Sequence, residues 1–174
     1  MSAPRAAPPP EPDVTDAQRA LVASVAEAAE RPTLPPAARE RYACAQALVL
    51  DQGRAWTPVP LGADLEPHRG VPGGCYTFAA RLADAVPGLV YVEGYACPQS
   101  GAGWAIPHAW VGRLADGAAL DPTWSAPGTA YYGVPLTAPF RRSAPRAPGT
   151  AALLVEMLPR DVRRHGLPPG AVAR

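Results

Sequence analysis

The sequence predicts an α+β fold, because its helical patterns come first and a helix then leads into three or more antiparallel strands. Apolar residues recur at helical spacing through residues 15–31 and 36–52. Short runs rich in Val and Tyr, separated by Gly-containing turns, follow residue 88. Helices and strands that occupy separate parts of a chain are typical of the α+β class.

The chain of 174 residues has room for one domain, which we expect over residues 13–160. Residues 1–12 are rich in Pro and Ala and too poor in bulky apolar side chains to pack, so a disordered or polyproline-like tail is expected there. Residues 161–174 are expected to be a loose C-terminal tail.

Two helices are predicted in the first third of the chain. Thr15 followed by Gln18 fits a capping box at the start of the first helix. The second helix is predicted over about Pro36–Gln52, with Cys44 on its apolar side and Gly53 as its stop.

Residues 54–74 combine prolines and glycines without a sustained period, which predicts a long loop and a possible lid over a cleft. The predicted elements that follow are a helix over Cys75–Val86, strands over 89–95, 108–114, 118–124 and 131–135, and a strand or helix over 151–158.

Composition excludes several classes of function. The net charge is +1, without the basic excess of a dedicated nucleic-acid binder. No window approaches the roughly 18 apolar residues of a membrane span, and the first residues lack the apolar segment of a secretory signal. Three cysteines, an odd number at wide spacing, do not form a disulfide framework, so a reduced, cytoplasmic protein is expected. The chain has no Lys and no Asn, which excludes any site that needs either.

Cys75 is the candidate nucleophile. It lies in the first turn of a predicted helix behind Gly73 and Gly74. A helix N-terminus carries roughly half a positive charge, which favours a thiolate over a thiol. The glycines let a substrate approach, and the amide of Cys75 can serve as an oxyanion donor.

His108 and Asp121 lie on the two strands of a predicted hairpin. With a three-residue loop, Asp121 falls opposite Val111 and the two side chains face opposite sides of the sheet. One extra residue, as a β-bulge at Gly112 or a shifted turn, brings Asp121 opposite Trp110. The carboxylate then shares a face with His108, at roughly 8 Å between Cα atoms, within reach of an imidazole hydrogen bond.

Four motifs follow one another between residues 70 and 133: Gly74-Cys75-Tyr76, Tyr91-Val92-Glu93-Gly94-Tyr95, His108-Ala109-Trp110 and Asp121-Pro122-Thr123. In this order they resemble the transglutaminase-like core of the papain-like superfamily. Its members include protein-crosslinking enzymes, cysteine peptidases, peptide N-glycanases, peptide-tailoring enzymes and catalytically dead relatives.

The resemblance implies a triad of Cys75 as nucleophile, His108 as base and Asp121 as the carboxylate that orients the imidazole. The reaction it implies is acyl transfer from an amide or ester of a peptide, protein or small molecule, through a thioester and without a cofactor. A second oxyanion donor is not identified, and Gln46 and Gln52 are weak candidates.

Two other interpretations of the same residues remain open. Cys75, His108 and Asp121 are chemically acceptable zinc ligands, but their spacing matches no short zinc motif, so no metal is expected. A catalytically silent binding or scaffold module on the same fold is the main alternative.

Other side chains have more than one interpretation. Glu93 could contact substrate, pair with an Arg, or lie in solvent. Five aromatic residues could line a cleft or form core: Trp104, Trp110, Trp124, Tyr131 and Tyr132.

Overall fold

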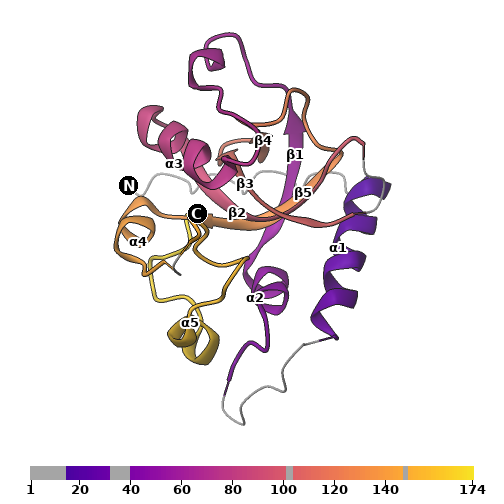
Figure 1. The fold of residues 1–174 in the computed structure, drawn as a ribbon, viewed down its shortest axis with the longest axis vertical. Coiled ribbons are helices and arrows are strands. Elements are labelled where there is room, and N and C mark those ends of the chain that lie inside the picture. Colours follow the sequence, from indigo (N-terminus) through magenta and orange to yellow (C-terminus); the bar gives the residue numbers. More distant parts are fainter. Residues whose placement is uncertain (1–14, 32–39, 101–103, 147–148) are drawn as a thin grey trace, which may run out of the picture.

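A closed sheet of five strands, ordered β1-β4-β3-β2-β5, forms the centre of the computed structural model, which describes residues 15–31, 40–100, 104–146 and 149–174 (Figure 1). The strands are β1 (Arg54–Val59), β2 (Leu89–Cys97), β3 (Ile106–Arg113), β4 (Ala118–Leu120) and β5 (Ala130–Leu136). Neighbouring strands are antiparallel except β1 and β4, which are parallel. The predicted α+β class is confirmed.

Side-chain alternation along β2 gives the sheet two apolar faces. Val92 packs with Trp56 and Trp110 in a cluster built from strand residues. Tyr91 and Tyr95, on the other face, belong to the larger core that the sheet shares with the helices. Both faces are therefore covered, which explains why β2 is almost continuously buried.

The helices α1 (Asp16–Ala29) and α2 (Ala45–Gln52) lie together beside β5 (Figure 1). Thr15 caps α1 as predicted, accepting a hydrogen bond from the backbone N of Gln18 at 3.1 Å. The capping box is only half formed, because the Gln18 amide instead donates to the carbonyl of Tyr131 at 2.6 Å.

The second helix is shorter than predicted. It begins at Ala45, and Cys44 is its N-cap, half-buried, rather than a member of its apolar side. The expected start at Pro36 lies outside the described residues, as does the tail expected over 1–12.

The prediction of an unbroken loop over 54–74 is wrong. The segment begins with β1, which lies between β4 and β5, and also contains the short 3-10 helix η1 (Glu66–His68). Pro58 hides the strand pattern in the sequence, while Trp56 anchors the strand in the core with only 1% of its surface exposed. This strand closes the sheet, so the lid expected over 54–74 cannot include it.

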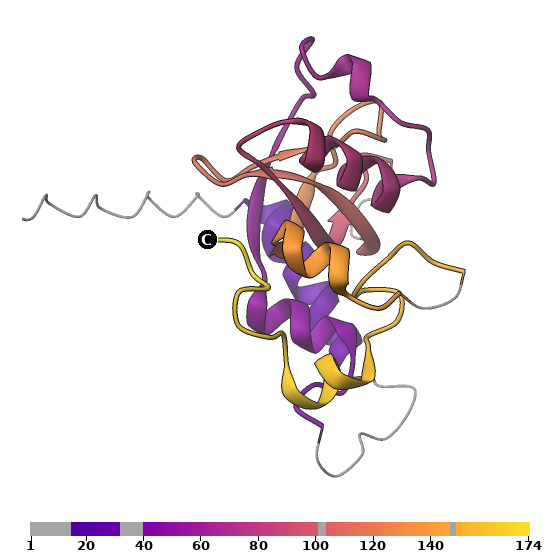
Figure 2. The same cartoon turned by 90° about the vertical axis from the view of Figure 1, so that its left-hand side faces the viewer.

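The C-terminal part of the chain forms α4 (Ala138–Ser143) and α5 (Arg160–His165), while residues 151–158 form neither the strand nor the helix expected there. The last residues, expected to be loose, return past α2 to the sheet (Figure 2). Val172 bridges Leu136, and the backbone N of Ala173 donates to the carbonyl of Pro135 at 2.9 Å. No helix within the described ranges is long and apolar enough to cross a membrane.

Candidate active site

Cys75 is the first residue of α3 (Cys75–Ala85), which packs on β2 and β3. Gly73, at φ +84°, turns the chain, and Gly74 caps the helix. A Cβ on Gly74 would lie 2.7 Å from a ring carbon of Phe78, so glycine is needed for the first turn to pack. Cys75 is 8% exposed.

The β3–β4 hairpin has the register that brings His108 and Asp121 to one face. Arg113 pairs with Ala118 and Val111 with Leu120, so Asp121 follows at the level of Trp110. A four-residue turn over 114–117, with Gly117 at φ +72°, produces this register.

The shifted turn, rather than the β-bulge considered at Gly112, is therefore the device that sets the register. Gly112 pairs regularly with Ala119. Glycine is needed at this position for a different reason: a Cβ there would overlap the Trp56 ring.

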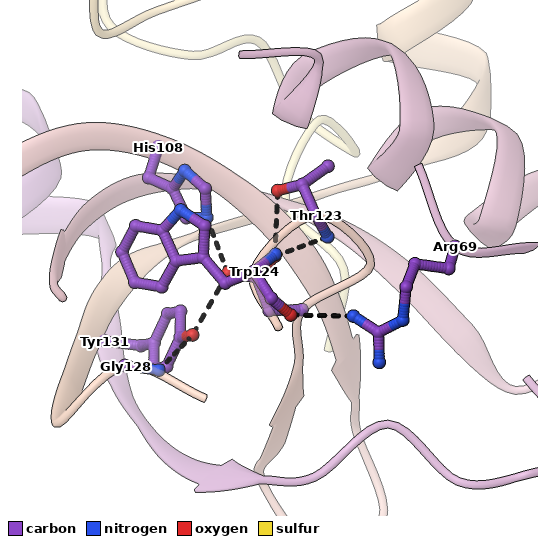
Figure 3. Close-up of polar contacts among 7 residues, drawn as sticks. Arg69, His108, Thr123, Trp124, Gly128 and Tyr131 are labelled. Atoms are coloured by element: carbon purple, nitrogen blue, oxygen red, sulfur yellow. Dashed lines mark hydrogen bonds and ion pairs between the residues drawn. The ribbon is translucent and has the colours of Figure 1, made fainter. Parts of the chain in front are cut away.

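His108 and Asp121 form a buried pair, each 3% exposed, with 2.6 Å between Nε2 and Oδ2 (Figure 3). The hydroxyl of Tyr131 donates to the same carboxylate oxygen at 3.0 Å. The other oxygen accepts from the backbone N of Thr123 at 2.8 Å, from its hydroxyl at 3.0 Å and from the backbone N of Trp124 at 3.1 Å. Asp121 is thus fixed from every side, and the orientation of His108 is fixed with it.

Aromatic packing holds the imidazole in place. The indole of Trp124 stacks on the His108 ring, with centroids 4.1 Å apart and planes 17° from parallel. Arg69 donates to the carbonyl of Trp124 at 2.7 Å, and the backbone N of Gly128 donates to the hydroxyl of Tyr131 at 2.7 Å (Figure 3). The loop after β4 is therefore tied down on both sides of the pair.

The electrostatics favour a charged pair. Burial alone would lower the pKa of His108, but the hydrogen bonds and negative charges of Asp121 and Cys75 outweigh it and raise the pKa to about 9. For Asp121, burial would raise the pKa, but the hydrogen bond and charge of His108, with the bonds from Thr123, lower it. An imidazolium faces a carboxylate at neutral pH. Because Nε2 is engaged by Asp121, Nδ1 is the ring nitrogen left for the thiol of Cys75.

A cavity of ≈ 560 Å³ adjoins this cluster. Thr123 and Trp124 contribute to both the cluster and the cavity wall, and the wall also includes Gly70, Pro72 and Gln99. The cavity is in the size range of small-molecule and side-chain sites.

Several other expectations are settled by burial and contacts. Glu93 is fully buried away from solvent and forms no ion pair with an Arg of the described ranges; its carboxylate accepts hydrogen bonds from three consecutive backbone N–H groups. Trp110 is core, whereas Trp104 is 74% exposed. The amide of Gln52 donates to its neighbour Asp51, on the surface.

Sequence reasoning did not assign Thr123 and Tyr131 to the site. The Asp-Pro-Thr run carried a usable signal for Thr123, because an Asp side chain commonly accepts hydrogen bonds from the residues two positions on. Tyr131 carried none, since nothing local shows that its hydroxyl reaches a carboxylate across the sheet.

Comparison of the chain with models of protein families, with curated proteins and with solved structures finds no match. Within the described ranges, no group of three or more His, Cys, Asp or Glu side chains is placed to hold a metal ion.

Proposed function

We propose that this protein catalyses thiol-dependent acyl transfer on an amide or ester, with Cys75, His108 and Asp121 as a catalytic triad. The observation that carries the proposal is the buried imidazole of His108, hydrogen-bonded to Asp121 at 2.6 Å and facing Cys75 at the start of α3. Nucleophile, base and a third group that orients the base are the recurring parts of activated nucleophiles.

In the proposed reaction, the proton of the Cys75 thiol is already held by His108 before substrate binds, and Asp121 stabilises this imidazolium beside the Cys75 thiolate. The thiolate attacks the carbonyl carbon of the substrate, and the backbone N–H of Cys75, which has no partner within the helix, donates to the developing oxyanion. His108 then protonates the leaving amine or alcohol, which leaves a thioester on Cys75. Water or an amine attacks the thioester and releases the acyl group.

The transglutaminase-like assignment belongs to the same proposal. It is supported by the order of the three residues, by the helix that begins at the cysteine, by the histidine on β3, and by the aspartate directly after the adjacent strand β4. The substrate class that follows is a peptide, a protein or a small amide or ester.

A catalytically silent binding module is the second candidate, and the burial of the site favours it. Cys75, His108 and Asp121 are each less than a tenth exposed. A side-chain network buried to this degree can serve to fix the loop after β4 rather than to perform chemistry.

Alkylation of each cysteine by iodoacetamide, read by peptide mass spectrometry across pH, separates the two candidates. We expect Cys75 to react at pH 6.5 nearly as fast as at pH 8.5, because the imidazolium of His108 persists over this range. His108→Ala and His108→Gln should slow the reaction at pH 6.5 by about tenfold or more, since an unassisted thiol is about 1% ionised there.

Cys44 and Cys97 serve as internal controls in the same samples. If Cys75 follows their pH dependence, or if both His108 variants leave its rate unchanged, the triad does not operate and the binding module becomes the better account. Circular dichroism of the two variants checks that the fold persists.

A further inference from the structure

A second cavity, of ≈ 280 Å³, runs along α3 on the side that faces α4 and the chain beyond it. Its wall extends from Tyr76 in the first turn of α3 to Asp84 in the third, and Leu153 closes it from the C-terminal part of the chain. The residues that line this cavity are distinct from those that line the cavity beside Trp124.

Positive charge dominates the wall. Arg81, Arg141 and Arg146 contribute three guanidinium groups, against the single carboxylate of Asp84. Arg81 and Arg146 are exposed, and neither pairs with a carboxylate among the described residues. Arg146 donates to the carbonyl of Arg141, at 3.2 Å.

Arg141 is the unusual member, because its side chain is only 6% exposed. One terminal nitrogen donates to Asp84, and the guanidinium lies over the ring of Tyr91, 5.6 Å from its centroid. Its Nε–H is buried and has no hydrogen-bond partner in the described part of the chain. A buried donor without a partner is costly, and here it belongs to a side chain that lines a cavity.

The buried carboxylate of Glu93 is not an acceptor for the Nε–H of Arg141. It lies behind Tyr91, whose hydroxyl donates to it at 2.7 Å, and its remaining capacity is taken by the backbone N–H groups of Leu153, Leu154 and Val155. None of the described residues therefore supplies an acceptor to the Nε–H of Arg141, which leaves this donor available to a bound molecule.

We propose that this cavity binds an oxyanion, a carboxylate or phosphate group, with Arg141 as its buried donor and Arg81 and Arg146 as cations at its opening. Guanidinium groups match both anions in geometry and charge. A volume of ≈ 280 Å³ accommodates such a group with a short attached chain rather than a drug-sized ligand. The proposal does not depend on the acyl-transfer function.

Titration of the ¹⁵N-labelled full chain with sodium phosphate, and separately with sodium acetate, tests the site at constant ionic strength maintained with sodium chloride. The Nε–H resonance of Arg141 should shift saturably, because the group gains an acceptor. Arg81→Gln and Arg146→Gln should each weaken binding by about tenfold, the loss expected for one charge-assisted contact. Both residues are exposed, so these variants should fold.

Arg142→Gln is the matched control. Arg142 is exposed on the same short helix and contacts Asp84 at 3.6 Å, but it does not line the cavity. The proposal is overturned if neither salt gives a saturable shift of Arg141, or if Arg142→Gln weakens binding as much as Arg81→Gln. Tighter binding of phosphate identifies a phosphoryl ligand, and tighter binding of acetate identifies a carboxylate ligand; either supports the site.

Discussion

Asp121 shows how much of a buried site depends on a single carboxylate. It stabilises the imidazolium of His108, and it also organises the loop behind it through hydrogen bonds from Thr123, Trp124 and Tyr131. A buried charge of this kind is stable only because every lone pair has a donor. The same network that would make His108 a useful base is therefore part of what holds the fold together.

The pKa of His108 makes stability depend on pH. Its value of about 9 lies above the ordinary value of about 6.5, so the folded protein holds the proton more tightly than the unfolded chain. The stabilisation is fully present below about pH 6.5 and is lost as the pH rises through about 9. We expect the free energy of unfolding, from urea titrations, to fall by on the order of a few kcal/mol between pH 6.5 and pH 9.5.

Two variants separate this effect from other titrations. His108→Gln should lose most of the decrease over this pH range, because the titrating group is gone. His165→Gln removes an exposed histidine and should leave the decrease unchanged. A flat profile in the unmodified protein would show that His108 is not held as an imidazolium.

At the level of the element, two glycines of the β3–β4 hairpin are needed for different reasons. Gly117 adopts φ +72°, with nothing within 4 Å of an added Cβ, so only its backbone conformation matters. Gly112 has an ordinary backbone, but a Cβ there would overlap the indole of Trp56.

We therefore expect Gly117→Ala to lower the free energy of unfolding by about 1 kcal/mol, and Gly117→Asn to recover most of the loss, because Asn tolerates this conformation. Gly112→Ala should cost about 3 kcal/mol, the upper range for overpacking a core. Urea unfolding of the three variants measures both effects. Equal losses for the two alanine variants would contradict the distinction between conformation and space.

Elements that depend on nearby residues were predictable from the sequence. α3 begins at Cys75 behind two glycines, and the Val- and Tyr-rich pattern of β2 located that strand. β1 was missed because its partners, β4 and β5, lie far along the chain and its own pattern is interrupted by Pro58. The sheet closes by pairing β1 with strands far along the chain, so the residue pattern of β1 alone does not predict that closure.

The candidate site also has a part that the sequence predicted and a part that it did not. The cysteine was proposed from its place at a helix start, and the histidine and the aspartate from a predicted hairpin and a family resemblance. The register that joins His108 to Asp121 was narrowed to a bulge or a shifted turn. The structure has the shifted turn, over 114–117, and nothing in the sequence favoured it over a bulge at Gly112. The stacking of Trp124 on His108 was not predicted from the sequence either, because the path of the loop that carries Trp124 is set by its tertiary contacts.

At the scale of the whole molecule, Glu93 joins the sheet to the C-terminal part of the chain. The backbone N–H groups of Leu153, Leu154 and Val155 all donate to its carboxylate, at 2.5–2.9 Å. Burial is the largest influence on the pKa of Glu93 and raises it, while these hydrogen bonds act in the opposite direction. The apolar run that suggested a strand or helix over 151–158 is instead an irregular segment whose amides are satisfied by one side chain from β2.

Glu93→Gln should therefore destabilise the whole domain rather than one element. The amide oxygen of glutamine can replace Oε1 and accept from the three backbone N–H groups, but without the negative charge these hydrogen bonds are weaker. The NH₂ group that replaces Oε2 then faces the backbone N–H of Leu153, and the Tyr91 hydroxyl must accept rather than donate. We expect a loss of about 2–4 kcal/mol in the free energy of unfolding, measured by urea titration. Glu156→Gln, at an exposed position beside the same segment, is the matched control and should stay within about 0.5 kcal/mol of the unmodified protein. If the two variants were equally stable, the C-terminal segment would be held by its apolar side chains alone, and the buried carboxylate would need another explanation.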